Sequence, residues 1–100
     1  MIKDLFLGFI KIHILYHAAK EPVFGAQLIR ELERHGYHIS PGTIYPILHR
    51  LLNGGYLTLE ERKVNGKIRK YYRATAKGKK ALSGGKDKIR ELVAEVIEEK

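Results

Sequence analysis

A run of basic side chains without a single acid lies between residues 62 and 80. The nine cations of this run are Arg62, Lys63, Lys67, Arg69, Lys70, Arg73, Lys77, Lys79 and Lys80. Because the whole chain carries a formal charge of +8, the segment accounts for the entire excess, and the other residues sum to −1. Solvated surfaces normally mix the two signs of charge. The run therefore predicts a polyanionic partner whose phosphates these side chains bind.

A second group of candidate residues lies on one face of an expected helix over residues 40–54. Ser40 suits the N-cap position and Pro41 the first helical position. Apolar residues then recur at three- and four-residue spacing and form the core stripe: Ile44, Ile47, Leu48, Leu51 and Leu52. At about 100° per residue, the opposite face carries Gly42, Tyr45, Pro46, His49, Arg50 and Asn53.

This second face has the chemistry to bind DNA. An arginine such as Arg50 can hold a guanine edge with two hydrogen bonds, and His49 can offer one. The Tyr45 hydroxyl is placed to reach a phosphate oxygen, and free amides at Gly42 and Thr43 suit a phosphate at the start of the helix. The face therefore predicts a helix that lies in the major groove.

The basic run falls on an expected β-hairpin over residues 56–75, because Asn65-Gly66 is the strongest short hairpin signal. With these two residues as the loop, opposed positions sum to 131, and Leu57 and Leu59 fall on the buried face. Arg62 then lies opposite Arg69, while Glu61 faces Lys70. Like charges directly opposed cost about a few tenths of a kcal/mol or more. A phosphate that bridges the two arginines would remove this cost.

Three further helices complete the expected fold. Residues 2–19 are apolar almost all round, residues 24–35 form an amphipathic helix that Gly36 ends, and Thr75 is the N-cap of the last helix. We expect a break or kink near residues 83–86, because two interior glycines cost roughly 2 kcal/mol relative to alanine. The first and last helices carry apolar stripes that a second copy of the chain would cover. The expected dimer interface comprises Leu5, Phe6, Phe9, Ile89, Leu92, Val93, Val96 and Ile97.

Other functional classes have weaker support. The chain has no cysteine, no nucleophile motif and no phosphate loop, and Glu60 and Glu61 point to opposite faces of a strand, so we expect no enzyme and no cofactor. One alternative is a metal or small-molecule sensor that uses His13 and His17, which are spaced i, i+4, with Asp4 and Glu21 as the nearest acids. Another is RNA binding through the same hairpin, with Tyr71 as the stacking residue. No apolar run approaches the length of a membrane span, which favours a cytoplasmic protein.

Four segments of the chain resemble the PadR family of transcriptional repressors: Ser40 to Leu51, Gly55-Tyr56-Leu57, Arg69-Lys70-Tyr71-Tyr72 and Thr75-Ala76-Lys77-Gly78. The Tyr45-Pro46 pair is the most specific element. The resemblance implies a dimeric repressor of the short subfamily, in which the C-terminal helix and the first helix build the dimer. Some members hold flat aromatic ligands between the subunits, so a small aromatic effector is a possible partner. This chain has Ala26 where the family commonly has an aromatic residue, and it has no tryptophan.

Together these patterns predict a mostly helical α+β fold of the winged helix-turn-helix type. It comprises three helices, a two-stranded β-hairpin wing and a C-terminal dimerisation helix. Residues 1–80 form the DNA-binding part, and residues 81–100 form the dimerisation helix, packed with the first helix in one structural domain. The predicted function is a homodimeric repressor that reads a pseudo-palindromic operator in double-stranded DNA. The expected DNA-binding residues are Ser40, Gly42, Thr43, Tyr45, Pro46, His49, Arg50, Arg62, Lys63, Lys67, Arg69 and Lys70.

Overall fold

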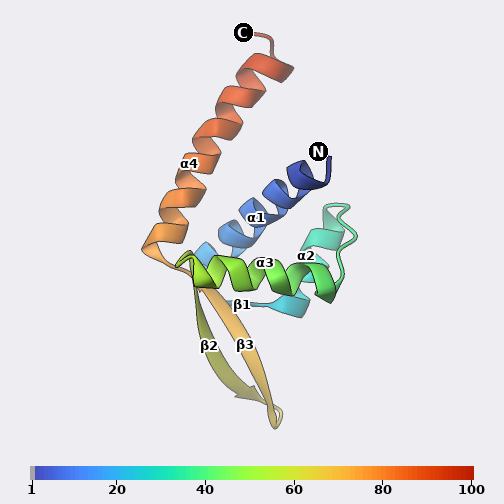
Figure 1. Cartoon of the computed structure of the whole chain (residues 1–100), viewed down its shortest axis with the longest axis vertical. Coiled ribbons are helices and arrows are strands. Elements are labelled where there is room, and N and C mark those ends of the chain that lie inside the picture. The colour runs from blue at the N-terminus through green and yellow to red at the C-terminus, as the bar shows by residue number, and fades with distance from the viewer. Residues whose placement is uncertain (1) are drawn as a thin grey trace.

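The fold is mostly helical, with a small antiparallel sheet (Figure 1). The computed structural model describes residues 2–100, and side chains from residue 3 onward. Its elements are α1 (Ile2–Lys20), β1 (Val23–Phe24), α2 (Gly25–Arg34), α3 (Pro41–Asn53), β2 (Leu57–Val64), β3 (Lys67–Ala74) and α4 (Ala76–Leu92), which a π-helical segment (Val93–Ile97) continues. The β2–β3 hairpin, called the wing below, projects from one end of the three-helix body, and α4 projects from the other. This arrangement confirms the predicted winged-helix class.

The core is formed where α1, α2, α3 and the base of the wing meet. The completely buried large side chains are Ile14, Leu28, Leu32, Ile44, Ile47, Leu48 and Leu57. They are the apolar positions that recur along each predicted helix, together with the first residue of β2. Because these stripes face inward, the polar face of α3 is left on the surface.

Glycines end two helices and orient the chain that follows. Gly36, at φ +87°, follows α2, and the Tyr37 amide donates to the Leu32 carbonyl at 3.0 Å. Gly55, at φ +81°, follows α3 in the same way. In this motif, a left-handed residue lets the next amides satisfy carbonyls that the helix leaves free. The predicted stop at Gly36 is thus confirmed.

Thr75 joins the end of α3 to the start of α4. Its hydroxyl oxygen accepts from the Gly78 amide at 3.0 Å and donates to the Gly55 carbonyl at 2.6 Å. One side chain therefore caps α4, as predicted, and ties it to the segment behind α3. This connection fixes where the wing leaves the body.

The wing has the register expected from its loop. Asn65 and Gly66 have φ values of 52° and 77°, as a two-residue hairpin turn requires, and Leu57 pairs with Ala74, Leu59 with Tyr72 and Arg62 with Arg69. A strand that the sequence did not predict extends this sheet to three strands in the order β1-β3-β2. Phe24 was expected to be helical but is extended and pairs with Tyr71. Two residues are too few to show a strand period, so only the pairing with β3 defines β1.

The expected break in the last helix is wrong, because α4 runs without interruption through Ser83, Gly84 and Gly85. Gly85 lies against α1, where a Cβ atom would be 4.0 Å from Cγ1 of Ile12. Leu82, one turn earlier, is buried. Packing on α1 thus offsets the low helix propensity of the two glycines.

Candidate nucleic-acid interface

The outer face of α3 is exposed as the sequence predicts. Among the expected DNA-binding residues of this helix and its cap, Thr43 is half-buried, and those exposed are Ser40, Gly42, Tyr45, Pro46, His49 and Arg50. The opposite stripe is buried in the core, so the helix cannot turn this face inward. The face is therefore held outward by the packing behind it.

The start of α3 differs from the prediction in two details. Ser40 occupies the N-cap position, but its side chain makes no bond to the helix backbone and lies 3.5 Å from the Thr43 hydroxyl. The Thr43 amide, expected to be free for a phosphate, donates to the Ser40 carbonyl at 3.0 Å. A tight first turn thus uses this amide inside the helix. The expected pair of amide donors is reduced to that of Gly42.

Tyr45 connects α3 to the beginning of α2. A Cβ atom at Gly25 would lie 2.5 Å from the Tyr45 hydroxyl oxygen and 2.7 Å from its ring. The ring therefore occupies space that only a glycine at position 25 leaves open. Tyr45 is still 45% exposed, so it packs against α2 and remains partly open to solvent.

The opposed arginines of the wing are stabilised within the protein. The Arg62 guanidinium lies 4.5 Å from the centroid of the Tyr71 ring and forms an ion pair of 2.9 Å with Glu60. The Arg69 guanidinium lies 4.2 Å from the Phe24 ring. Cation–π contacts and the ion pair offset the like-charge repulsion. A bridging phosphate is thus not needed to explain the register.

Two other expectations for the wing are changed by these contacts. Tyr71, the stacking residue of the RNA alternative, is half-buried between Arg62 and Phe24, whose ring lies 5.5 Å away, centroid to centroid, in a T-shaped contact. Its ring is therefore less available to a nucleobase. Glu61 and Lys70 pair in register as predicted, but they are not among the ion pairs of the described residues.

A cleft of about 550 Å³ separates the wing from the start of α2 and α3. Its lining brings Tyr45 together with three cations of the wing, Lys67, Arg69 and Lys70. His49, Arg50, Arg62 and Lys63 do not line it. The cleft therefore has Tyr45 of α3 on one side and cations of β3 on the other.

Ile68 is a candidate that the sequence reasoning missed. It lines the same cleft and is 68% exposed, although it shares a strand face with the buried Tyr72. The two-residue period placed it on the core side of the wing, but the core ends before it. The sequence did carry a signal for this residue, because it is an apolar side chain that lies beside cations and beyond the core.

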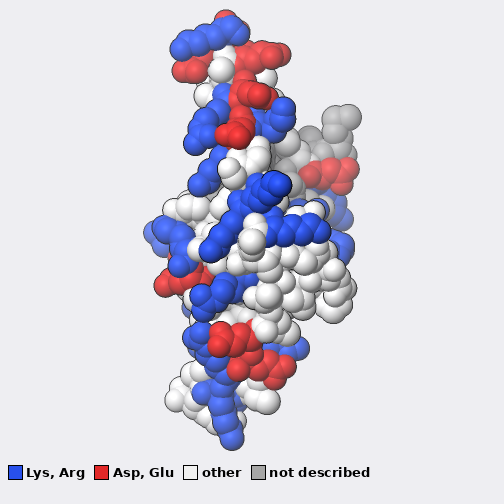
Figure 2. Space-filling model, turned by 90° about the vertical axis from the view of Figure 1, so that its left-hand side faces the viewer, with Lys and Arg blue, Asp and Glu red and all other residues white. Residues whose placement is uncertain are grey.

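Basic side chains are spread over the wing and α4. Viewed from the side of α4 (Figure 2), they extend from the hairpin tip along much of the molecule, with acids interspersed on the wing and near the C-terminus. The acids of the wing are Glu60 and Glu61 on β2. In the sequence the stretch without acids runs from Arg62 through the hairpin tip and β3 to the start of α4, while Glu60 and Glu61 lie beside β3 in the sheet.

The histidines have different neighbours from those expected. His13 stacks on His35 at a ring-centroid distance of 4.9 Å. Among the described residues, no group of three histidine, aspartate or glutamate side chains could hold a metal ion, so the metal-sensor alternative gains no support. Burial, followed by the nearby His35 and His17, lowers the pKa of His13.

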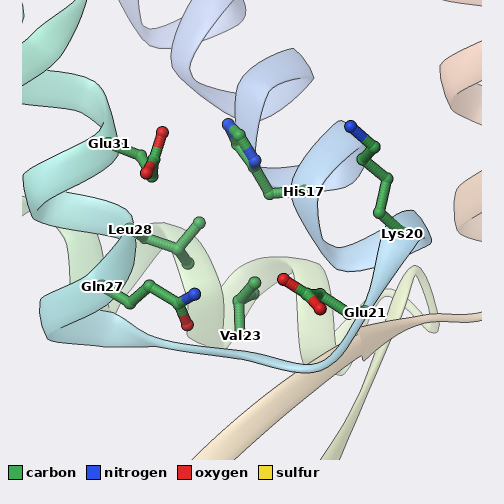
Figure 3. A pocket seen from close by; sticks show the side chains of 7 residues that line it. All are labelled: His17, Lys20, Glu21, Val23, Gln27, Leu28 and Glu31. Carbon is green, nitrogen blue, oxygen red and sulfur yellow. The ribbon is translucent and has the colours of Figure 1, made fainter.

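His17 lines a small polar pocket of about 280 Å³ at the junction of α1 and α2. In Figure 3 its ring and the Glu31 carboxylate point toward one another, above Val23 and Leu28. Burial lowers the pKa of His17, and the negative charge of Glu31 partly opposes that shift. These side chains lie away from the wing and the outer face of α3.

The apolar stripes of α1 and α4 are largely exposed in the single chain. Of the expected interface residues, Ile89 is half-buried, and those exposed are Leu5, Phe6, Phe9, Leu92, Val93, Val96 and Ile97. The C-terminal part of α4 extends beyond the three-helix body (Figure 1). Ile97, at its end, is 74% exposed. Exposed apolar side chains that gather on one surface are typical of a partner interface.

None of the helices in the described residues is both long enough and apolar enough to cross a membrane.

Comparison with known proteins identifies regulators that share this fold. A family model described as the transcriptional regulator PadR-like family matches residues 14–84. The transcriptional regulator Rv3488 of Mycobacterium tuberculosis is 50% identical over 88 residues, which cover 88% of this chain and 82% of that protein.

Two solved structures are similar over nearly the whole chain. A PadR-like transcription factor from Bacteroides fragilis has a TM-score of 0.83 and 30% identity, and the match covers 96% of this chain and 94% of that one. A PadR-like transcriptional regulator from Bacillus cereus has a TM-score of 0.81 and 31% identity, with 98% and 93% coverage.

Proposed function

The chain belongs to the PadR-like family of transcriptional regulators, and from that premise we propose that it is a homodimeric repressor that binds a pseudo-palindromic operator in double-stranded DNA. The observation that carries this proposal is the cleft in which Tyr45 faces the wing cations Lys67, Arg69 and Lys70, beside the exposed face of α3. A regulator that binds DNA works where the DNA is, so we place this function in the cytoplasm.

In this proposal α3 reads the bases. Arg50 and His49 are exposed one turn beyond Tyr45 and donate hydrogen bonds to base edges in the major groove, where each base pair has its own donor and acceptor pattern. Ser40, Thr43 and Pro46 line the approach to the groove, and the Gly42 amide faces a phosphate at the positive end of the helix dipole.

The wing supplies affinity without sequence preference. Lys67, Arg69 and Lys70 neutralise phosphates of the strand that runs through the cleft, and the Tyr45 hydroxyl donates to the same strand from the other wall. Arg62 and Lys63 extend the cationic surface along β2. Phosphate contacts of this kind fix the register of a protein on DNA but carry no base preference.

Dimerisation uses the stripes on α1 and α4. Two copies that cover each other's exposed stripes remove contiguous apolar surface from water, at about 25 cal/mol per Å². A two-fold axis through residues 81–100 of both copies then presents two α3 helices to half-sites about one helical turn, roughly 34 Å, apart. The palindromic operator follows from this symmetry.

The test is fluorescence anisotropy with labelled duplexes from the DNA flanking the gene, alongside random duplexes of the same length. We expect tight binding to one duplex and a logarithm of affinity that falls by about 0.9 per neutralised phosphate as the logarithm of salt rises. Lys88→Ala on α4 is a matched charge control that should leave binding unchanged. An absence of binding to every duplex at low salt contradicts the proposal.

The dimer has its own measurement. Sedimentation equilibrium should give twice the 11.5 kDa chain mass at micromolar concentration. Val96→Glu, which places a charge in the exposed stripe, should give a monomer that keeps its helical content. If the wild-type chain sediments as a monomer at the concentrations that saturate DNA, the proposed pseudo-palindromic operator is contradicted.

A further inference from the structure

The chain contains two asparagines, Asn53 and Asn65, and a glycine follows each of them. An asparagine before a glycine readily loses its side-chain amide, because glycine has no Cβ atom that keeps its backbone nitrogen away from the asparagine side chain. The glycine amide nitrogen is the nucleophile of this reaction. The two dipeptides are identical in sequence, but the structure places their glycine amides in different surroundings.

The Asn53-Gly54 pair is held in place at the end of α3. Asn53 is the last residue of the helix, and the Gly54 amide donates to the Arg50 carbonyl at 2.9 Å. The Gly54 carbonyl accepts from Nζ of Lys77 at 2.7 Å, and a Cβ atom at Gly54 would lie 2.9 Å from the Tyr56 ring. These contacts must open before the Gly54 nitrogen can reach the Asn53 side chain.

The Asn65-Gly66 pair forms the turn at the tip of the wing, away from the three-helix body (Figure 1). Both residues are exposed, and outside the neighbouring residues no atom lies within 4 Å of a Cβ placed at Gly66. Within the described residues, the Gly66 amide has no acceptor among the turn and loop hydrogen bonds. The Asn65 side chain is likewise absent from the side-chain hydrogen bonds of this part of the chain. The nucleophile and the amide that it attacks are therefore both free.

The charges around this turn favour the same reaction. Attack requires the Gly66 amide to lose its proton, and the negative charge then passes to the side-chain oxygen of Asn65. Lys63 and Lys67 lie within two residues of the turn, whereas the nearest acid along the chain is Glu61. Because nearby cations favour the anionic form of a group, the wing stabilises both the deprotonated amide and the anion that follows it.

We propose that Asn65 is a site of self-modification, at which the side-chain amide becomes a carboxylate, and that this conversion weakens DNA binding. The Gly66 nitrogen bonds to Cγ of Asn65, the bond from Cγ to the side-chain nitrogen breaks, and ammonia leaves with the proton of the Gly66 amide. One water molecule then opens the five-membered imide. Opening at Cγ gives aspartate, and opening at the backbone carbonyl carbon gives isoaspartate, in which the main chain runs through the former side chain.

Both products oppose the role proposed for the wing, so the second half of the inference rests on the proposed DNA-binding function. Asn65 lines the same cleft as Lys67 and Arg69. A carboxylate at this position therefore adds a negative charge where the phosphates of DNA are expected. Isoaspartate also lengthens the backbone of a two-residue turn whose geometry matches the twist of the two wing strands. The modification thus lowers affinity without a change in α3.

The modification is measured by peptide mapping with mass spectrometry after the native protein has been incubated at mildly alkaline pH. Asn65 should convert at least about threefold faster than Asn53, because no hydrogen bond of the glycine amide has to break first. In guanidinium chloride, where the folded surroundings are lost, the two asparagines should convert at similar rates. Equal native rates, or faster conversion at Asn53, overturn the assignment of Asn65.

Two variants separate the asparagines. Asn65→Gly keeps a residue that suits the turn and should remove most of the ammonia that the native protein releases. Asn53→Gln removes the other candidate and should leave the release close to that of the wild type. The opposite pattern would assign the reaction to the end of α3 and contradict the proposal.

The effect on DNA is measured in the anisotropy titration. Asn65→Asp supplies the charge alone and should weaken binding about two- to fivefold at low salt, for specific and random duplexes alike. Ser83→Asp, on the exposed surface of α4, is the matched charge control and should leave the affinity unchanged. Fully converted wild-type protein should lose more affinity than Asn65→Asp, because part of it contains isoaspartate, and Asn65→Gly should lose none during the same incubation.

The two halves of the inference can fail separately. Conversion at Asn65 with unchanged DNA affinity, or equal effects of Asn65→Asp and Ser83→Asp, overturns the effect on DNA binding but leaves the modification site. Fresh wild-type protein that binds no duplex overturns the proposed function instead, and the peptide map still decides whether Asn65 is modified.

Discussion

The Tyr45 ring on α3 packs directly against the backbone of Gly25, the first residue of α2, which leaves no room for a Cβ atom there. This contact sets the distance between the two helices on the side that faces the wing. It also explains why a tyrosine that points outward from α3 remains only partly exposed. The position of the hydroxyl in the cleft thus depends on a residue twenty positions earlier in the chain.

Gly25→Ala should displace the Tyr45 side chain while the fold is retained, because the ring can rotate away more easily than the helix backbone can move. We expect weaker DNA binding in the anisotropy titration, in the same direction as Tyr45→Phe, which removes only the hydroxyl. Circular dichroism should show unchanged helical content. If Gly25→Ala binds DNA as tightly as the wild type, the packing of Tyr45 on α2 has no part in recognition.

Residues of the wing and of α3 should respond differently to alanine substitution. Lys67→Ala and Lys70→Ala should lower the affinity for all duplexes alike, and each should reduce the salt slope by about 0.9. Arg50→Ala should instead reduce the difference in binding free energy between the specific and the random duplexes by about 1 to 3 kcal/mol. The measurement is the affinity for both duplexes at several salt concentrations. Equal behaviour of the two classes would refute the assigned roles.

Removal of the Tyr71 ring should expose the repulsion between Arg62 and Arg69. Tyr71→Leu loses the edge-to-face contact with Phe24 and the cation–π contact with Arg62. We therefore expect the free energy of unfolding, measured by urea denaturation, to fall by about 1 to 2 kcal/mol. The loss should shrink at high salt, which screens the two guanidinium groups. Tyr71→Phe keeps the ring and should be close to wild type. A salt-independent loss would mean that packing alone was removed.

The glycines of α4 should differ in their tolerance of alanine. No atom lies within 4 Å of a Cβ placed at Gly84, so Gly84→Ala should raise the free energy of unfolding by about 1 kcal/mol and the melting temperature by several degrees. A Cβ at Gly78 would collide with the Tyr56 carbonyl oxygen. Gly78→Ala should therefore lower stability by about 1 to 3 kcal/mol. Calorimetry of the two variants checks that the free energy of unfolding changes in opposite directions.

Stability should fall as the pH drops below the usual titration range of histidine. Burial and the neighbouring His35 hold the pKa of His13 below its unfolded value, and burial also lowers the pKa of His17. Between the folded and unfolded pKa values, the unfolded chain binds more protons, so acid favours unfolding. The stability that the neutral histidines contribute is fully present above about pH 6.5. It is lost as the pH falls through their lowered pKa values.

The measurement for this prediction is the melting temperature between about pH 7.5 and pH 5. His13→Gln should flatten the curve, whereas His38→Gln, in the exposed turn before α3, should leave its shape unchanged. An identical acid loss in His13→Gln and wild type would assign the effect to other groups.

The sequence by itself determined the parts of this protein that short segments specify. The turn residues Asn65 and Gly66 fixed the wing register, including the opposition of Arg62 and Arg69. Gly36 and Thr75 marked one helix end and one helix start, and the three- and four-residue spacing in α3 separated its buried stripe from its outer face. Each of these follows from the local preferences of a few neighbouring residues.

Only the tertiary structure decided how distant segments meet. The pairing of Phe24 with Tyr71 created β1 and covered the opposed arginines, the packing of Gly85 on α1 kept α4 continuous, and His35 rather than an acid came to lie beside His13. The contact of Tyr45 with Gly25 and the cleft between the wing and the start of α2 and α3 arose in the same way. These features depend on which surfaces become neighbours when the core closes, and that information is spread over the whole chain rather than carried by a local pattern.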